Sequence, residues 1–297
     1  MAKNSDRRSR RVSTPPKKGS RIVMGVVAMA VFILISMGGL AWMRSGPDDP
    51  VKPVSSDNPP AGGSTPRAAT RVDYEVVNSY PHDPTAFLQG LVWHDGFFYE
   101  STGLEGQSTL RRVEFPSGRV AKMVRLDPDL FGEGLALVGD RLIQLTWTTG
   151  KGLIYDRESF NRVGEFRYET EGWGLAFDGQ NLILSDGSNV LTYLDPQTFK
   201  PVKKLAVMMN GRPARQLNEL EFIEGEIWAN VWQTDRIVRI DPASGQVTSY
   251  LDLQNLLPAQ MRRGGEDVLN GIAYDPAKKR IFVSGKLWPR LFEIRLK

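Results

Sequence analysis

The chain has 297 residues, of which 41% are hydrophobic and 24% charged, and it contains two histidines and no cysteine. A chain of this length can hold one large β domain with additional segments. The lack of cysteine excludes a disulfide framework, a thiolate zinc site and a cysteine nucleophile, and two histidines are too few for a histidine-rich metal centre. Residues 1–71 carry 12 Lys/Arg against 4 Asp/Glu, and the other 226 residues carry 26 against 30. The basic charge therefore belongs to the N-terminal region, and no nucleic-acid partner, metal or cofactor is predicted.

The first predicted segments are a basic cytoplasmic N-terminus, residues 1–21, and a transmembrane anchor, residues 22–43. The anchor is an uncharged run long enough to cross a bilayer, and eight Lys/Arg against one Asp precede it. This bias keeps the N-terminus in the cytoplasm and places the C-terminal domain outside it, in the periplasm or the extracellular space. The alternative is a signal peptide cleaved near Gly39-Leu40-Ala41, which would release a secreted protein.

Residues 44–71 form the next predicted segment, a linker that contains six prolines together with Ser, Gly and Asp. This composition cannot bury a hydrophobic core, so the segment is predicted to be a disordered tether. Residues 72–297 are predicted to be the folded domain of the chain.

A repeat occurs five times in this domain: a Gly or Glu, then Leu or Ile, then alternating apolar residues. The copies are Gly90-Leu91-Val92-Trp93, Gly134-Leu135-Ala136-Leu137, Gly174-Leu175-Ala176-Phe177, Glu219-Leu220-Glu221-Phe222 and Gly271-Ile272-Ala273-Tyr274. Successive copies start 44, 40, 45 and 52 residues apart, a spacing typical of propeller blades. A turn signal and a β-rich run follow each copy. The sequence therefore predicts an all-β fold, a five-bladed β-propeller.

The ends of the domain predict how the ring closes. Residues 291–297 supply a third strand for the last blade, and no fourth strand follows them. Residues 74–80 form a β-rich run before the first repeat and are predicted to complete that blade. This arrangement would cover an open sheet edge.

The residues just before the five repeat starts are candidates for a functional site, because inner strands of a propeller gather at one mouth of its channel. They are Gln89, Glu133, Trp173, Asn218 and Asn270. Glu133 lies between two glycines, which let the backbone bend and leave the carboxylate open to a ligand. The alternative is a turn carboxylate that pairs with a lysine.

Tryptophans and one lysine extend the candidate site. Trp147, Trp173, Trp228, Trp232 and Trp288 fall in or beside the predicted inner strands, where each could line the channel or pack in the core. Trp228 and Trp232 are four residues apart and are predicted to share a face of one strand. Lys286, at the end of a strand, could stabilise an oxyanion, and its alternative role is that of a solvated surface lysine.

Eight motifs lie in order in the domain. They are Tyr80-Pro81-His82-Asp83-Pro84-Thr85-Ala86-Phe87-Leu88-Gln89-Gly90-Leu91, Tyr99-Glu100-Ser101-Thr102-Gly103, Phe131-Gly132-Glu133-Gly134-Leu135, Gly172-Trp173-Gly174-Leu175, Leu217-Asn218-Glu219-Leu220-Glu221, Trp228-Ala229-Asn230-Val231-Trp232-Gln233-Thr234-Asp235, Val268-Leu269-Asn270-Gly271-Ile272 and Gly285-Lys286-Leu287-Trp288-Pro289. With these motifs the chain resembles, over residues 74–297, the plant and bacterial type of glutaminyl-peptide cyclotransferase (glutamine cyclotransferase).

The resemblance implies a five-bladed propeller and a metal-independent acyltransferase of the aminoacyltransferase class. Its substrates would be peptides or proteins whose N-terminal glutamine it converts to pyroglutamate with release of ammonia. Position by position, it implies that Glu133 is the catalytic acid/base and that Lys286 also acts in catalysis. The implied substrate pocket consists of Phe87, Gln89, Phe131, Trp147, Trp173, Asn218 and Trp232. A monomer is expected.

The reaction would need one carboxylate to accept a proton from the substrate's α-amine and to deliver one to the leaving amide nitrogen. Two alternatives remain at this stage. A metal-dependent, lactonase-like propeller could use Glu133, Asn218 and Asn270 as oxygen ligands for Ca²⁺. A non-catalytic propeller could instead display a face for binding other proteins.

Overall fold

The computed structural model describes residues 68–297. The predicted basic N-terminus, the predicted anchor and nearly all of the predicted linker lie outside these residues. In the described part of the chain no helix is both long enough and apolar enough to cross a bilayer.

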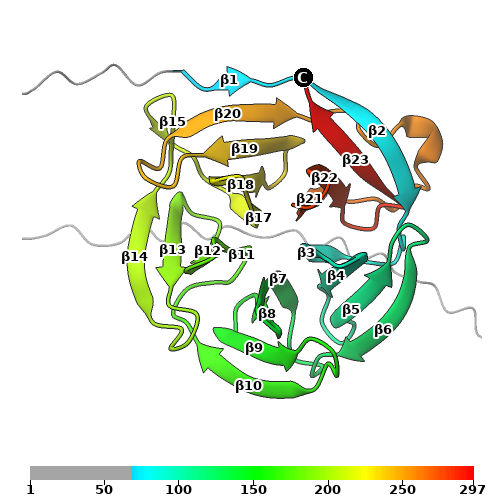
Figure 1. Ribbon diagram of the computed structural model, residues 1–297, viewed down its shortest axis with the longest axis vertical. Coiled ribbons are helices and arrows are strands. Elements are labelled where there is room, and N and C mark those ends of the chain that lie inside the picture. Colours follow the sequence, from blue (N-terminus) through cyan, green and yellow to red (C-terminus); the bar gives the residue numbers. More distant parts are fainter. Residues whose placement is uncertain (1–67) are drawn as a thin grey trace, which may run out of the picture. The chain divides into compact units, whose positions relative to one another are not determined.

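Five antiparallel four-stranded sheets are arranged as blades around a central axis (Figure 1). Blade 1 contains β3 (Leu88–His94), β4 (Phe97–Thr102), β5 (Thr109–Glu114) and β6 (Arg119–Arg125). Blade 2 contains β7 (Gly132–Val138), β8 (Arg141–Thr146), β9 (Lys151–Asp156) and β10 (Arg162–Arg167). Blade 3 contains β11 (Leu175–Phe177), β12 (Leu182–Leu184), β13 (Val190–Leu194) and β14 (Pro201–Ala206).

Blades 4 and 5 complete the ring. Blade 4 contains β17 (Leu217–Ile223), β18 (Glu226–Val231), β19 (Arg236–Ile240) and β20 (Val247–Asp252). Blade 5 contains β21 (Leu269–Asp275), β22 (Arg280–Gly285), β23 (Arg290–Leu296) and β2 (Tyr74–Pro81). The short strands β15 (Met208–Met209) and β16 (Arg212–Pro213) and the 3₁₀ helix η1 (Ala259–Met261) lie in the connections. The predicted five-bladed propeller is confirmed.

The ring closes through the N-terminal strand, as the sequence predicts. β2 pairs antiparallel with β23, from Tyr74 opposite Leu296 to Pro81 opposite Arg290. An additional strand, β1 (Thr70–Arg71), pairs parallel with β20 and extends blade 4. The predicted linker includes these two residues, and their backbone joins the edge of this sheet.

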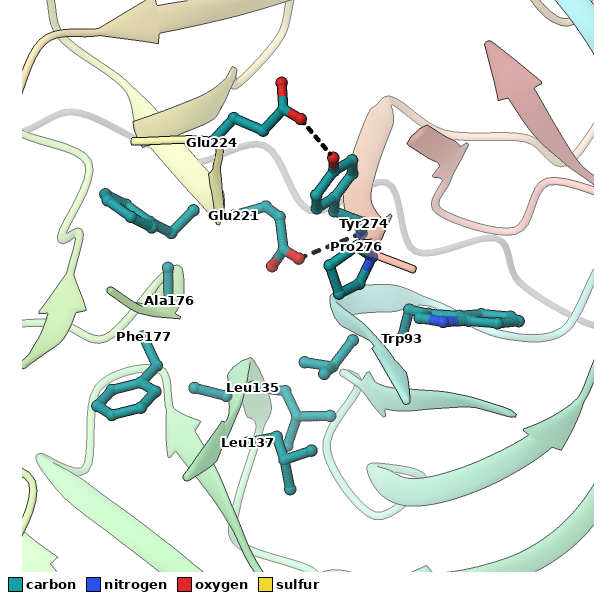
Figure 2. Close-up of a pocket in the computed structure, with 12 residues that line it drawn as sticks. Trp93, Leu135, Leu137, Ala176, Phe177, Glu221, Glu224, Tyr274 and Pro276 are labelled. Atoms are coloured by element: carbon teal, nitrogen blue, oxygen red, sulfur yellow. Dashed lines mark hydrogen bonds between the residues drawn. The ribbon is translucent and has the colours of Figure 1, made fainter. Parts of the chain in front are cut away.

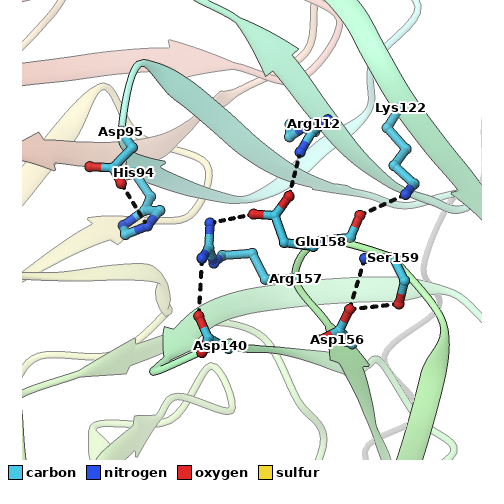
Figure 3. A network of polar contacts seen from close by, with 9 residues as sticks. All are labelled: His94, Asp95, Arg112, Lys122, Asp140, Asp156, Arg157, Glu158 and Ser159. Carbon is cyan, nitrogen blue, oxygen red and sulfur yellow. Dashed lines mark hydrogen bonds and ion pairs between the residues drawn. The ribbon is translucent and has the colours of Figure 1, made fainter.

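The hydrophobic core consists of five clusters, each between two neighbouring blades. Phe282 of blade 5, for example, packs against Leu91 and Phe98 of blade 1. Both faces of every blade are thus covered, which explains why the inner strands are runs of apolar residues. An outer link also joins blades 1 and 2, where Glu158 pairs with Arg112 and Arg157 (Figure 3).

The glycine that opens most repeats is required at the axis, where neighbouring inner strands approach one another closely. A Cβ atom at Gly134 would lie 2.5 Å from the backbone nitrogen of Leu175, and one at Gly174 would lie 2.0 Å from the carbonyl oxygen of Asn218. The main reason for a glycine at position 134 is therefore not the exposure of the neighbouring carboxylate, as the sequence suggested. Glycine has a hydrogen atom where other residues have a Cβ, and this small size allows blades 2 and 3 to meet.

Candidate active site

The site residues of four blades lie in irregularities of the inner strands. The pairing register between the first and second strands shifts around Gln89 in β3, Glu133 in β7, Asn218 in β17 and Asn270 in β21. A β-bulge of this kind leaves a residue out of the ladder and re-aims its side chain. In blade 3, Trp173 lies before β11, and its N–H donates to the carbonyl of Ser185 at 2.9 Å. These positions mark one mouth of the channel.

Glu133 is buried, with 5% of its surface exposed, and it is held by a chain of amides. The Nε2 of Gln89 donates to Oε1 of Glu133 at 2.9 Å. The Nδ2 of Asn270 donates to Oε1 of Gln89 at 3.3 Å and to the carbonyl of Leu88 at 3.1 Å. Side chains from blades 5, 1 and 2 therefore fix the orientation of one carboxyl group.

Burial raises the pKa of Glu133 well above its ordinary value. The ammonium of Lys286 opposes this shift, and the carboxylate of Glu171 reinforces it. Burial also lowers the pKa of Lys286, against the opposing charges of Glu133 and Asp267. Both shifts favour the neutral form of the group, so they bring the pKa values of this acid and this base closer together.

Lys286 follows β22 and is buried, which excludes the alternative of a solvated surface lysine. Its N–H donates to the carbonyl of Val268 at 2.9 Å, and its ammonium lies 4.9 Å from the centre of the Phe87 ring. The next residue, Leu287, has a φ of 61° and donates its N–H to the carbonyl of Ala86 at 2.8 Å. Two loops therefore hold the lysine in place.

Aromatic rings form two groups at this mouth. Phe131 packs edge-on against Phe87, with ring centres 6.1 Å apart, and contacts Trp147 with ring centres 5.6 Å apart. Trp173 and Trp232 form a second, T-shaped pair at 5.4 Å. The structure thus brings the predicted aromatic residues into neighbouring positions around the mouth, partly buried and facing solvent on one side.

Glu171 joins these two groups and was not found from the sequence. Its Oε2 accepts the indole N–H of Trp147 at 2.7 Å and that of Trp173 at 2.8 Å. In the sequence, the only sign of this role is an acidic residue two positions before Trp173. The two indole contacts become visible only from the geometry of the loops.

Two of the five tryptophans belong to the core. Trp228, on β18, is 2% exposed and packs between blades 4 and 5, and Trp288 packs in the same cluster. The prediction that Trp228 and Trp232 share a strand face is wrong, because β18 ends at Val231 and Trp232 lies in the turn that follows. The tryptophans at the mouth follow or precede strands rather than lying on inner strands.

Asn218 is buried at the start of β17, and within residues 68–297 its Oδ1 has no hydrogen-bond partner. It is therefore an acceptor available to a bound N–H group. The adjacent Glu219, in contrast, accepts the backbone N–H of Leu91 at 3.2 Å and of Ile272 at 2.8 Å. Glu219 links three blades across the axis and is not free for a ligand.

The opposite mouth holds a recess of about 460 Å³ that contains none of the predicted site residues. Leu135, Leu137 and Phe177 line it, and Glu221 lies among them with Oε1 accepting the N–H of Tyr274 at 3.2 Å (Figure 2). Burial raises the pKa of Glu221 to about 8. Across the described residues, no group of three or more His, Cys, Asp or Glu side chains is arranged to hold a metal ion.

A propeller with a buried carboxyl group of raised pKa beside an aromatic rim offers the groups that an acid–base enzyme needs. The family model for glutamine cyclotransferase matches residues 53–296 of the chain. The chain is 47% identical over 229 residues to a glutaminyl-peptide cyclotransferase of Arabidopsis thaliana, covering 76% of this chain and 72% of the relative. The crystal structure of a glutaminyl cyclase from Myxococcus xanthus matches with a TM-score of 0.72 and 43% identity, over 77% of this chain and 98% of the other. The chain belongs to the glutamine cyclotransferase family.

Proposed function

We propose that this protein is a glutaminyl-peptide cyclotransferase that converts the N-terminal glutamine of peptides to pyroglutamate and releases ammonia. The observation that carries the proposal is the buried carboxyl group of Glu133, held by Gln89 beneath the aromatic rim. The family and the similar enzymes from Arabidopsis thaliana and Myxococcus xanthus support the same activity.

The first step of the proposed mechanism is a proton transfer from the substrate's α-ammonium group to Glu133. The raised pKa of Glu133 supports this step, because it brings the carboxyl group closer to the pKa of an α-amino group, which is about 8. In a poorly hydrated site the neutral pair of amine and carboxylic acid is favoured over the charged pair. The amine that results carries the lone pair needed for attack.

In the second step the amine nitrogen forms a bond to the substrate's own γ-carboxamide carbon, and the carbonyl oxygen gains the negative charge. Lys286 would stabilise this oxyanion, and such a contact is typically worth about 3 kcal/mol. Glu133 then delivers its proton to the amide nitrogen, the carbon–nitrogen bond breaks, and ammonia leaves. The freed carboxylate of Glu133 removes the second proton from the ring nitrogen, and the released ammonia takes up this proton as ammonium. The charge and the protons balance without a covalent enzyme intermediate.

The aromatic rim would hold the substrate folded so that its amine meets its own side chain. In favourable cases, positioning of this kind lowers the activation free energy by about 7–11 kcal/mol. The free Oδ1 of Asn218 would accept an N–H of the substrate. Gln89 donates a hydrogen bond to Glu133, so its proposed role is to orient the carboxyl group.

The test is ammonia release from a Gln-Ala peptide by the full-length protein, with and without a metal chelator, together with a mass loss of about 17 Da. The proposal expects both signals, unchanged by the chelator. Lactone hydrolysis that requires a divalent ion, without ammonia release, would instead favour a metal-dependent hydrolase.

We further propose that residues 22–43 anchor the enzyme in a membrane and that the propeller acts outside the cytoplasm as a monomer. The uncharged run and the basic residues before it support this placement. Resistance of the membrane-bound protein to alkaline extraction, and protease access to the propeller from outside, are the expected results. Recovery of the full mature protein in the soluble fraction would contradict the anchor.

A further inference from the structure

Glu171 stands out at the active-site mouth because two indoles share one of its carboxylate oxygens. Trp147 follows β8 and Trp173 precedes β11, so they come from different blades, yet both N–H groups point to Oε2. The backbone supports the arrangement, since the N–H of Gly172 donates to the carbonyl of Trp147 at 2.9 Å. The carboxylate therefore closes the gap between the two aromatic groups described above.

The charge of Glu171 acts on the buried carboxyl group of Glu133. It reinforces the raised pKa of Glu133, while the nearby positive charge of Lys286 has the opposite effect. The remaining titratable groups around this point are Asp267, which acts on Lys286, and the hydroxyl of Tyr168, which bonds to the carbonyl of Thr146. Glu171 itself is solvent-exposed, whereas Glu133 is buried.

We propose that Glu171 is a specificity-determining residue that draws the substrate's protonated N-terminus into the mouth and fixes Trp147 and Trp173 as a single wall. The inference rests on the proposed function. The substrate would reach the enzyme with an α-ammonium group, and an exposed carboxylate between two indole rings is suited to attract an organic cation. Glu171 supplies the attraction, and Glu133, deeper in the site, takes the proton.

The two parts of this role separate by substitution. Glu171→Gln keeps an oxygen that accepts the indole N–H groups but removes the charge, whereas Glu171→Ala removes both. The matched control is Glu169→Gln, which removes an exposed charge two residues away. All three variants are compared with the wild-type full-length chain in steady-state ammonia release.

For Glu171→Gln we expect KM to rise about fivefold with kcat within about twofold, as loss of one partly screened charge contact predicts. Without the charge of Glu171 the pKa of Glu133 falls, so the acid side of the kcat/KM profile moves to lower pH. Glu171→Ala should show the same changes and, because the indole N–H groups also lose their acceptor, a lower kcat and a shift in tryptophan fluorescence. Glu169→Gln leaves all of these values unchanged.

Equal KM values and equal pH profiles for Glu171→Gln and Glu169→Gln would overturn the inference. A loss of kcat in Glu171→Gln at unchanged KM would also overturn it, because that pattern indicates a purely structural contact. Both results require an active wild-type enzyme, so they leave the proposed function intact. An inactive wild type with a normal circular dichroism spectrum would refute the proposed function, and the inference with it.

Discussion

At the scale of single residues, the pKa of Glu133 depends on burial and on two neighbouring charges. Burial and Glu171 raise it, and Lys286 lowers it. If the ionised carboxylate is the form that accepts the substrate's proton, kcat/KM increases as pH rises through this elevated pKa. The buried amide chain that ends at Gln89 adds geometric control, since it leaves the carboxyl group one main orientation.

We expect Glu133→Gln to lower kcat by about 10³, within the range that general acid–base groups contribute. The glutamine keeps the size of the side chain and an acceptor for Gln89, so the fold should be preserved. Ammonia release and circular dichroism measure the two effects. Glu221→Gln is the matched control, because it makes the same chemical change at the opposite mouth. Near-normal turnover in Glu133→Gln would refute the assigned role.

Glu221 predicts a pH dependence of stability. Its pKa is about 8 in the folded protein and about 4.5 when unfolded, so the folded state binds the proton more tightly. Its contribution is therefore neutral below pH 4.5 and increasingly destabilising as pH rises to 8. Glu221→Gln should unfold like the wild type near pH 4.5 and be more stable above pH 8.

The expected gain in unfolding free energy above pH 8 is on the order of 2 kcal/mol, because water reaching this partly exposed side chain reduces the full linkage value. Urea unfolding of both proteins at pH 4.5 and pH 8.5 measures it. A difference that is the same at both pH values would mean that Glu221 has the same pKa in the folded and the unfolded state.

At the scale of strands, close approach at the axis sets a strict limit on side-chain size. Gly134→Ala would place a methyl group 2.5 Å from the backbone of β11, where no flexible side chain can move away. Overpacking of this kind should reduce the unfolding free energy by about 2–3 kcal/mol. Thermal unfolding measures the change.

Gly265→Ala is the control for this prediction. A Cβ atom at Gly265 has no neighbour within 4 Å, and its φ lies outside the left-handed region, so a change close to zero is expected. If both alanine variants unfold at the same temperature, the close contact between blades 2 and 3 does not limit stability.

The same scale shows why the sequence predicted the blades well and the site incompletely. Alternating apolar residues and turn signals are local patterns, so they predicted the inner strands of all five blades at nearly their observed positions. The bulges around Glu133 and Asn218 depend on pairing between strands, and no local pattern encodes them. Trp228 was ambiguous for the same reason, because its contacts are with blade 5. Glu171 acquires its role only when two loops from different blades meet.

At the scale of the whole domain, every blade is stabilised by its two neighbours, so the ring has no independent unit. The strand that completes the ring, β2, contributes Tyr80, whose hydroxyl donates to Glu293 at 2.6 Å and whose ring packs against Phe115. Without β2, the third strand of blade 5 would become an open edge with unpaired backbone groups. The stability of the domain should therefore depend on β2 more strongly than the short length of this strand suggests.

A circular permutation tests this dependence. A chain of residues 82–297 lacks β2 and should aggregate or unfold without cooperativity, whereas a chain of residues 68–297 should show one cooperative transition. Joining residues 74–81 after Lys297 through a short glycine-rich linker should restore that transition. The geometry favours this connection, since the N–H of Lys297 donates to the carbonyl of Asp73 at 3.0 Å and Leu296 pairs with Tyr74. In the permuted chain β23 and β2 become a hairpin, so the strand returns to its place without crossing the ring.

A permuted chain with Pro in place of Val76, which pairs with Ile294, is the control and should fail to recover the cooperative transition. Cooperative unfolding of residues 82–297 alone would show instead that four complete blades and an open fifth are sufficient to hold the ring.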